Sequence, residues 1–213
     1  MTPRVRKLAL TAHVTCSVGW LGGVAAFLVL AVAGRTSQSD EVIRSAYISS
    51  DLIGRFALLP LSVASLLTGL VLALGTPWGL VRHYWVLTKF VLTVLAAVGL
   101  VLHQFTAGAG AARLVSGAAA GTLPGAELRA LGTQLVVDAS LALLVLLATT
   151  ALSVFKPWGR TPYGRREQGE SGEATATSGA GLKIALAVVG VILLVFAVSH
   201  LAGGGLHAHG AGR

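Results

Sequence analysis

Five long apolar segments constrain the fold of this chain more than any other feature of its sequence. Each reaches the length of about 20 residues that a helix needs to cross the hydrocarbon core of a bilayer. Charged residues make up only 11% of the chain, whereas a soluble domain carries about 25%. We therefore expect an all-α, polytopic membrane protein. The apolar segments are Leu8–Ala33, Leu52–Leu74, Tyr84–Thr106, Leu131–Phe155 and Leu182–Leu201.

The spacing of these segments divides the chain into three parts. Residues 1–156 contain the first four segments, and short connections such as Gly75–His83 favour an antiparallel four-helix transmembrane bundle. Residues 157–181 are rich in Gly, Ser, Thr and Glu, and we interpret them as a flexible cytoplasmic linker. Residues 182–213 are expected to form a fifth, peripheral transmembrane helix and a tail that contains histidines. The Ala- and Gly-rich stretch Gly108–Gly125 is expected to be an outer loop with some helix.

The basic residues in the loops predict the orientation. With the N-terminus inside, the cytoplasmic segments carry nine Lys and Arg residues and the outer segments carry five. The positive-inside rule therefore favours an N-terminus inside and a C-terminus outside. The formal net charge of +8 does not indicate a nucleic-acid partner, because these residues flank apolar spans. The inner residues are Arg4, Arg6, Lys7, Arg82, Lys156, Arg160, Arg165, Arg166 and Lys183, and the outer ones are Arg35, Arg44, Arg113, Arg129 and Arg213.

Ionisable residues inside the apolar segments are the strongest candidates for function. Lys89 and His103 lie in the third segment, and their separation returns to within roughly 40° of the same helix face. Charged groups inside a membrane usually face protein or a cavity. His13 and Lys89 lie equally far from the cytoplasmic ends of their segments. This places both roughly 8 Å inside the membrane. We predict that His13 and Lys89 face one another across a cavity, with Trp20 on the same helix face as His13.

A second polar cluster is predicted near the outer ends of the segments. Arg55 lies near the outer end of the second segment, His103 near that of the third, and Asp138 just inside the fourth. Arg55 and Asp138 are opposite charges at similar depth, which is the arrangement expected of a buried pair in a membrane. We predict that these two residues face each other inside the bundle, and we favour a structural over a catalytic role for them.

Each candidate in the inner half also has a structural interpretation. The side chain of Lys89 is long enough for its amine to reach the inner interface by snorkelling. His13 is equally compatible with an interfacial histidine bonded to a backbone carbonyl. Cys16 is the only cysteine of the chain, and we interpret it as a small core residue.

Three segments of the sequence resemble a known superfamily of bacterial membrane proteins. The run His13-Val-Thr-Cys-Ser-Val-Gly-Trp20-Leu-Gly-Gly resembles the first-helix motif of the HemJ-type protoporphyrinogen oxidases and the CopD copper-resistance proteins. The stretch from Pro60 to Leu70 is similar to their second helix. Trp85-Val-Leu-Thr-Lys89, followed by an apolar run and His103, resembles the third helix of the HemJ type.

The resemblance to the HemJ type implies a cofactor and a class of reaction. It implies that a b-type haem lies between the first and third helices, with His13 and Lys89 as ligands of the haem iron. It further implies a redox role such as porphyrinogen oxidation in the bacterial cytoplasmic membrane, with a porphyrin substrate and an electron acceptor as partners. Haem propionates would then be expected to contact Arg82 or the basic cluster Arg4–Lys7.

Two other functions stay open at this point. The first is a copper-binding or copper-transport protein of the CopD type, which would use His13, His103, Cys16 and the histidines of the tail. Met1 is the only methionine of the chain, which argues against a thioether site for Cu(I). The second is a non-catalytic membrane scaffold. Homo-oligomerisation is compatible with all of these functions.

Overall fold

The computed structural model describes residues 1–75, 83–119 and 122–155, and these ranges are almost entirely helical. They contain four candidate membrane spans by length and composition: Pro3–Thr36, Asp40–Gly75, Tyr84–Gly117 and Gly125–Phe155. The expected all-α architecture with four helices long and apolar enough to cross a membrane is therefore confirmed for the described residues. The predicted linker at 157–181, the fifth helix and tail at 182–213, and Arg82 lie outside the described residues.

The first span is the central helix of the bundle. Helix α1 (Pro3–Thr36) begins with a proline, whose missing N–H costs nothing at the first helical position. The hydroxyl of Thr2 caps the helix by accepting a hydrogen bond from the backbone N of Val5 at 3.4 Å. Helix α1 packs against the second and fourth spans, and its buried side includes Trp20 and Phe27.

The second span starts earlier than the sequence suggested. It consists of α2 (Asp40–Ile53), a π-helical turn η1 (Gly54–Leu58) and α3 (Leu59–Gly75). The expected start at Leu52 is therefore wrong, and the reason is that residues 40–51 form an amphipathic helix. Acidic residues occupy its first turn, where the helix dipole favours negative charge. Its buried residues are Ala46, Tyr47 and Ser50.

The third span is also longer than expected. It consists of α4 (Tyr84–His103), a second π-helical turn η2 (Gln104–Gly108) and α5 (Ala109–Gly117). The stretch expected to be an outer loop is thus helical through Gly117, because Ala109, Ala111 and Val115 are buried and α5 packs against α2. The fourth span is the single helix α6 (Gly125–Phe155).

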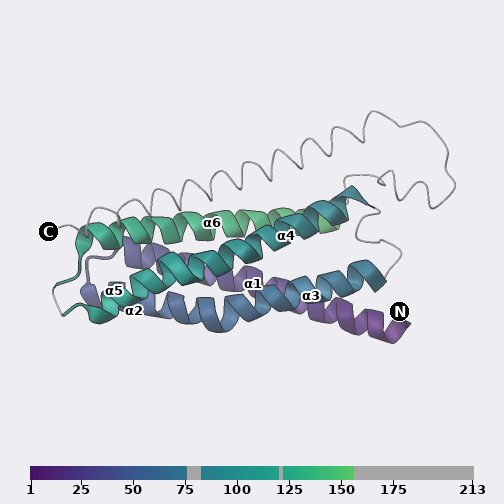
Figure 1. Cartoon of the computed structure of the whole chain (residues 1–213), viewed down its shortest axis with the longest axis horizontal. Helices are drawn as coiled ribbons and strands as arrows, with labels where there is room; N and C mark the ends of the chain where they lie inside the picture. The colour runs from purple at the N-terminus through teal and green to yellow at the C-terminus, as the bar shows by residue number, and fades with distance from the viewer. Residues whose placement is uncertain (76–82, 120–121, 156–213) are drawn as a thin grey trace, which may run out of the picture.

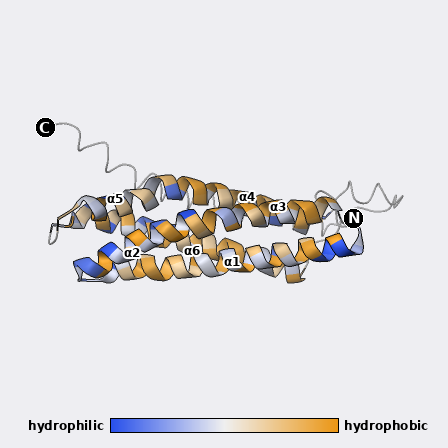
Figure 2. Cartoon of the chain, turned by 90° about the horizontal axis from the view of Figure 1, so that it is seen from below, coloured by the Kyte–Doolittle hydropathy of each residue, from blue (hydrophilic) through white to orange (hydrophobic). Residues whose placement is uncertain are grey.

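The four spans lie side by side and alternate in direction along the chain (Figure 1). Helix α4 packs against both α3 and α6, while α1 packs against α3 and α6. Large apolar side chains cover the outside of the bundle, and Phe56 is 76% exposed and Leu144 64% exposed. Figure 2 shows this apolar surface in orange along the helices, with hydrophilic residues at the N-terminal end of α1. Such a surface is suited to lipid rather than to water.

A basic side chain closes the end of the third span. The guanidinium of Arg44, on α2, donates to the backbone O of Val115 through Nη1 and to the backbone O of Ala118 through Nη2 at 3.0 Å. The last carbonyls of a helix have no partner within the helix. Arg44 therefore satisfies the C-terminal end of α5 and ties it to α2.

Candidate functional site

A cavity of about 240 Å³ lies between the helices toward the N-terminal end of α1, and we call it the His13 cavity. Helices α1, α3, α4 and α6 all contribute to its wall. His13 and Lys89 both line it, so the structure brings these two residues to one cavity as their matched depths predicted. The polar and charged residues of its lining are Arg6, His13, Ser65, Lys89, Thr93 and Ser153.

The imidazole of His13 is oriented by α3. Its Nδ1 lies 3.1 Å from the backbone O of Ser65 and 3.1 Å from the hydroxyl of Thr68. Because a carbonyl can only accept, Nδ1 carries the proton and Nε2 of the neutral ring keeps its lone pair. The ring also lies close to Gly69, where an added Cβ would be 3.0 Å from Cε1. The bond to Ser65 fits the structural interpretation of His13, and it is equally the usual orienting bond of a metal-ligating histidine.

Lys89 contributes an amine to the same cavity. It lies in the second turn of α4 and is partly buried. Among the residues that the structure describes, no carboxylate forms an ion pair with it. Arg6 lines the cavity from α1 and is exposed, so the cavity has one basic side chain inside and one at its edge. Because Lys89 lines the cavity, snorkelling to the interface is not needed to explain its position.

The glycines of α1 near His13 accommodate side chains of the second span and do not open space beside the histidine. An added Cβ at Gly19 would lie 3.4 Å from a methyl of Leu61, and one at Gly23 would lie 2.6 Å from Leu58. Both glycines therefore accommodate leucines of the second span, and Gly69 is the glycine that gives the imidazole its room.

A second cavity of about 220 Å³ lies farther along the bundle, and we call it the His103 cavity. It is lined by α1, α4 and α6, with Leu58 of η1 also in its wall. Trp20 lines this cavity and is not part of the lining of the His13 cavity. Apart from the edges of Trp20, His103 and Asp138, the wall consists of aliphatic and Phe27 side chains and Gly99. The candidate residues of the sequence are thus divided between two cavities.

His103 and Asp138 form a buried pair at the wall of the His103 cavity. Nδ1 of His103 lies 2.9 Å from Oδ2 of Asp138, and each side chain is only 6% exposed. Phe27 contacts the imidazole edge to face, with ring centroids 5.5 Å apart. Nε2 of His103 and Nε1 of Trp20 are buried without a hydrogen-bond partner among the described residues.

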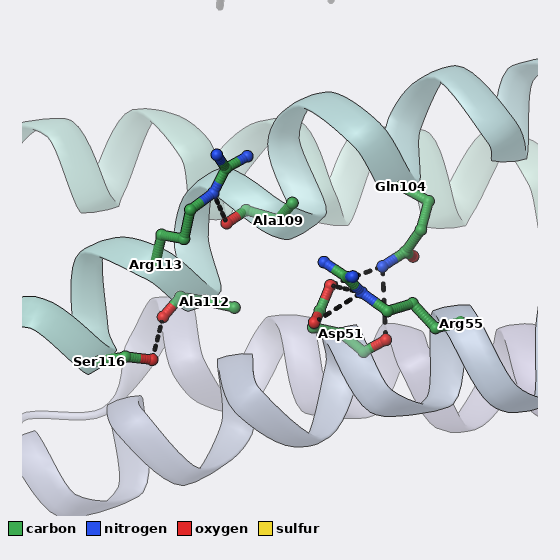
Figure 3. Close-up of polar contacts among 7 residues, drawn as sticks. All are labelled: Asp51, Arg55, Gln104, Ala109, Ala112, Arg113 and Ser116. Carbon is green, nitrogen blue, oxygen red and sulfur yellow. Dashed lines mark hydrogen bonds and ion pairs between the residues drawn. The ribbon is translucent and has the colours of Figure 1, made fainter.

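The predicted pair of Arg55 and Asp138 inside the bundle is wrong. Nε of Arg55 lies 2.9 Å from Oδ2 of Asp51, one helical turn earlier, and the Arg55 side chain is 48% exposed. Figure 3 shows this pair together with Gln104, whose Nε2 donates to Oδ1 of Asp51 at 2.6 Å. The four-residue spacing of Asp51 and Arg55 is the usual one for helical ion pairs and was visible in the sequence. The pair of Asp51 and Arg55 forms within one span. Unlike a pair with Asp138, it does not depend on the placement of a second helix.

The described residues do not assemble the copper site that the sequence allowed. Within 1–75, 83–119 and 122–155, no three His, Cys, Asp or Glu side chains are grouped as a metal site. His13 and His103 line different cavities, and Cys16 lines neither. The tail histidines His200, His207 and His209 lie outside the described residues.

Comparison of the chain with protein-family models, with curated proteins and with solved structures finds no match.

Proposed function

We propose that this chain is a redox protein of the bacterial cytoplasmic membrane that binds b-type haem in the His13 cavity, with porphyrinogen oxidation as its reaction class. The observation that carries the proposal is that His13 and Lys89, from two different spans, line one cavity. The resemblance of the first three spans to HemJ-type proteins supplies the identity of the ligand. The loop charges supply the orientation, with the N-terminus inside.

The donor atoms of the cavity fit the iron of a haem. His13 donates through Nδ1 to Ser65 and keeps the Nε2 lone pair for a metal. Lys89 offers an amine that no described carboxylate engages, and such an amine ligates iron in its neutral form. Arg6 at the edge of the cavity is a suitable partner for a propionate, since guanidinium groups bind carboxylates in a bidentate manner. A haem held there would supply one-electron transfer.

The size of the cavity sets how such a group is held. The volume of about 240 Å³ is below the about 300–1,000 Å³ of typical ligand pockets. The cavity has exposed residues in its lining, Arg6 and Leu10 among them. The chain would therefore enclose the ligating centre of the macrocycle and leave part of its edge to the lipid.

An absorption spectrum of the protein purified after haem-replete expression tests the proposal. We expect a Soret band in the wild type, its loss in His13→Ala, and a shifted or weakened band in Lys89→Ala. His103→Ala is the matched control, because it removes a histidine from the other cavity and should leave the band intact. A wild-type protein without haem would remove the proposal, and so would loss of the band in His103→Ala but not in His13→Ala.

A further inference from the structure

The His103 cavity is a second candidate site, and the haem proposal makes no use of it. It is an apolar space inside the bundle, with a buried His–Asp pair and a buried indole at its wall. Buried polar atoms in proteins nearly always have a hydrogen-bond partner, and exceptions ask for an explanation. Two such exceptions, His103 Nε2 and Trp20 Nε1, belong to residues that line this one cavity.

The chemistry of these two atoms defines the group that would satisfy them. With Nδ1 of His103 donating to the Asp138 carboxylate, Nε2 is an acceptor when the ring is neutral. The indole Nε1 of Trp20 can only donate. A hydroxyl group is the smallest group that donates to the first atom and accepts from the second. Because Asp138 holds the opposite side of the ring, Nε2 points away from the carboxylate.

The apolar wall and the volume of the cavity define the rest of the ligand. An apolar cavity of about 150 Å³ is large enough to bind benzene, and the His103 cavity has about 220 Å³. It is therefore large enough to hold one substituted aromatic ring. Trp20 and Phe27 line the cavity, and aromatic side chains favour edge-to-face or offset contacts with a ring.

The position of the cavity favours a ligand that arrives through the lipid. Val98 and Leu102 of α4 belong to the lining and are 50% and 47% exposed on the outer surface of the bundle. These two residues therefore belong both to the cavity wall and to the lipid-facing side of α4. In addition, the π-helical turn η2 begins directly after His103, and such turns occur frequently at functional sites.

We propose that the His103 cavity binds a single hydroxylated aromatic ring, the chemistry of a membrane quinol head group or of a small phenol. In the complex, the ligand hydroxyl donates to Nε2 of His103 and accepts from Nε1 of Trp20, while the ring fills the apolar space. Asp138 acts as a positioning residue, because it fixes the tautomer and the plane of the imidazole.

Binding of phenol and of toluene to the full chain in lipid nanodiscs, measured calorimetrically against empty nanodiscs, tests the proposal. The two probes have nearly the same shape, but only phenol has a hydroxyl group. After correction for partition into lipid, we expect phenol to bind at least about tenfold more tightly, a ratio that its two hydrogen bonds can supply together. In His103→Leu this preference should fall, because only the bond from Nε1 of Trp20 is left.

Substitutions in the apolar wall test whether binding takes place in this cavity. Ala142→Leu places a larger side chain in the cavity and should weaken phenol binding at least about tenfold. Ala151→Leu is the matched control, because Ala151 lies on the same helix and is exposed. It should bind phenol like the wild type.

Histidine labelled with ¹⁵N provides a readout on the wild type that does not depend on the folding of any variant. Phenol, but not toluene, should shift the Nε2 resonance of His103. Equal affinity for the two probes, an undiminished preference for phenol in His103→Leu, or equal loss of phenol binding in Ala142→Leu and Ala151→Leu would overturn the proposal. A decyl-substituted benzoquinol that binds more tightly than phenol assigns the site to a membrane quinol, and one that binds more weakly assigns it to a small phenol.

Discussion

Gly54→Ala is expected to destabilise the bundle, although alanine is the better helix former. Gly54 opens η1 and lies against the amide of Gln104. An added Cβ would overlap Oε1 of Gln104 and lie 2.7 Å from its Cδ. Gln104 is only 1% exposed, so its side chain cannot turn away without displacing other packed groups. The substitution must therefore move Gln104 or separate the second and third spans.

The magnitude follows from the contacts that Gln104 would lose. Its Nε2 donates to Oδ1 of Asp51 at 2.6 Å and to the backbone O of Asp51 at 3.3 Å. Interhelical hydrogen bonds in membranes contribute about 0.6 kcal/mol on average and at most about 1.7 kcal/mol. Overpacking adds about 1–3 kcal/mol, whereas replacement of a helical glycine by alanine returns about 1 kcal/mol. We expect a net loss of about 2 kcal/mol.

Unfolding in mixed micelles with increasing sodium dodecyl sulfate, followed by circular dichroism, measures this loss. The matched control is Gly22→Ala, because Gly22 lies in the middle of α1 and an added Cβ meets nothing within 4 Å. Gly22→Ala should be neutral or stabilising by up to about 1 kcal/mol. Both substitutions replace a helical glycine by alanine. Opposite changes in the free energy of unfolding would therefore isolate the contact with Gln104.

The cost of Gly54→Ala should also depend on Gln104 itself. In a Gln104→Ala background the amide is gone, and the added methyl group has space. The cost should then fall to near zero, while Gln104→Ala alone is destabilising because Asp51 loses a donor. The reasoning is refuted if Gly54→Ala is as stable as the wild type, or if its cost is the same in both backgrounds.

Two further predictions concern contacts between spans. Asp138→Ala should destabilise the fold by about 1–3 kcal/mol, because it leaves a buried donor on His103 without a partner. Adding His103→Leu should recover part of this loss. A coupling energy of zero in the double-mutant cycle would contradict an interaction between His103 and Asp138. Arg44→Ala should increase hydrogen exchange at the C-terminal end of α5, because its last carbonyls lose their partner. Arg113→Ala should not, because Arg113 bonds, among the described residues, to a carbonyl of its own helix. Equal exchange in the two variants would argue against the cap.

The four spans could be predicted from the sequence because the membrane imposes a length on every apolar segment. The start of the second span and the end of the third could not be predicted in this way. Helix α2 carries Asp40, Glu41 and Arg44, and a hydropathy pattern counts such residues as loop. Its buried positions Ala46, Tyr47 and Ser50 nevertheless recur with helical spacing. Amphipathic periodicity, rather than mean hydropathy, was the signal that would have extended this span.

The candidate residues were predicted with mixed success for a physical reason. Depth along a helix follows directly from residue counting, and it placed His13 and Lys89 at one cavity. The face of the helix on which a residue lies is harder to predict. The π-helical turns η1 and η2 each widen one turn, and they rotate the residues beyond them to a different face. Arg55 lies inside η1, and its predicted partner was therefore wrong.

Each of the two histidines holds a neighbouring helix and is also a candidate ligand-binding residue. A test of either cavity must separate these two roles. Apolar burial does little to drive helices together in lipid, so polar contacts between spans help to select neighbours. His13 uses Nδ1 to hold α3, and His103 uses Nδ1 to hold α6, which leaves Nε2 of each ring for a ligand. Replacement by alanine removes both functions at once and confuses misfolding with loss of binding.

Asparagine separates the two functions of His13. Its amide nitrogen lies as many bonds from Cα as Nδ1 does, so His13→Asn can still donate to the carbonyl of Ser65, but it has no counterpart of Nε2. If Nε2 of His13 binds the haem iron, His13→Asn should lose the Soret band and keep a stability closer to that of the wild type than His13→Ala does. A band retained in His13→Asn would show that the imidazole holds α1 to α3 and nothing more.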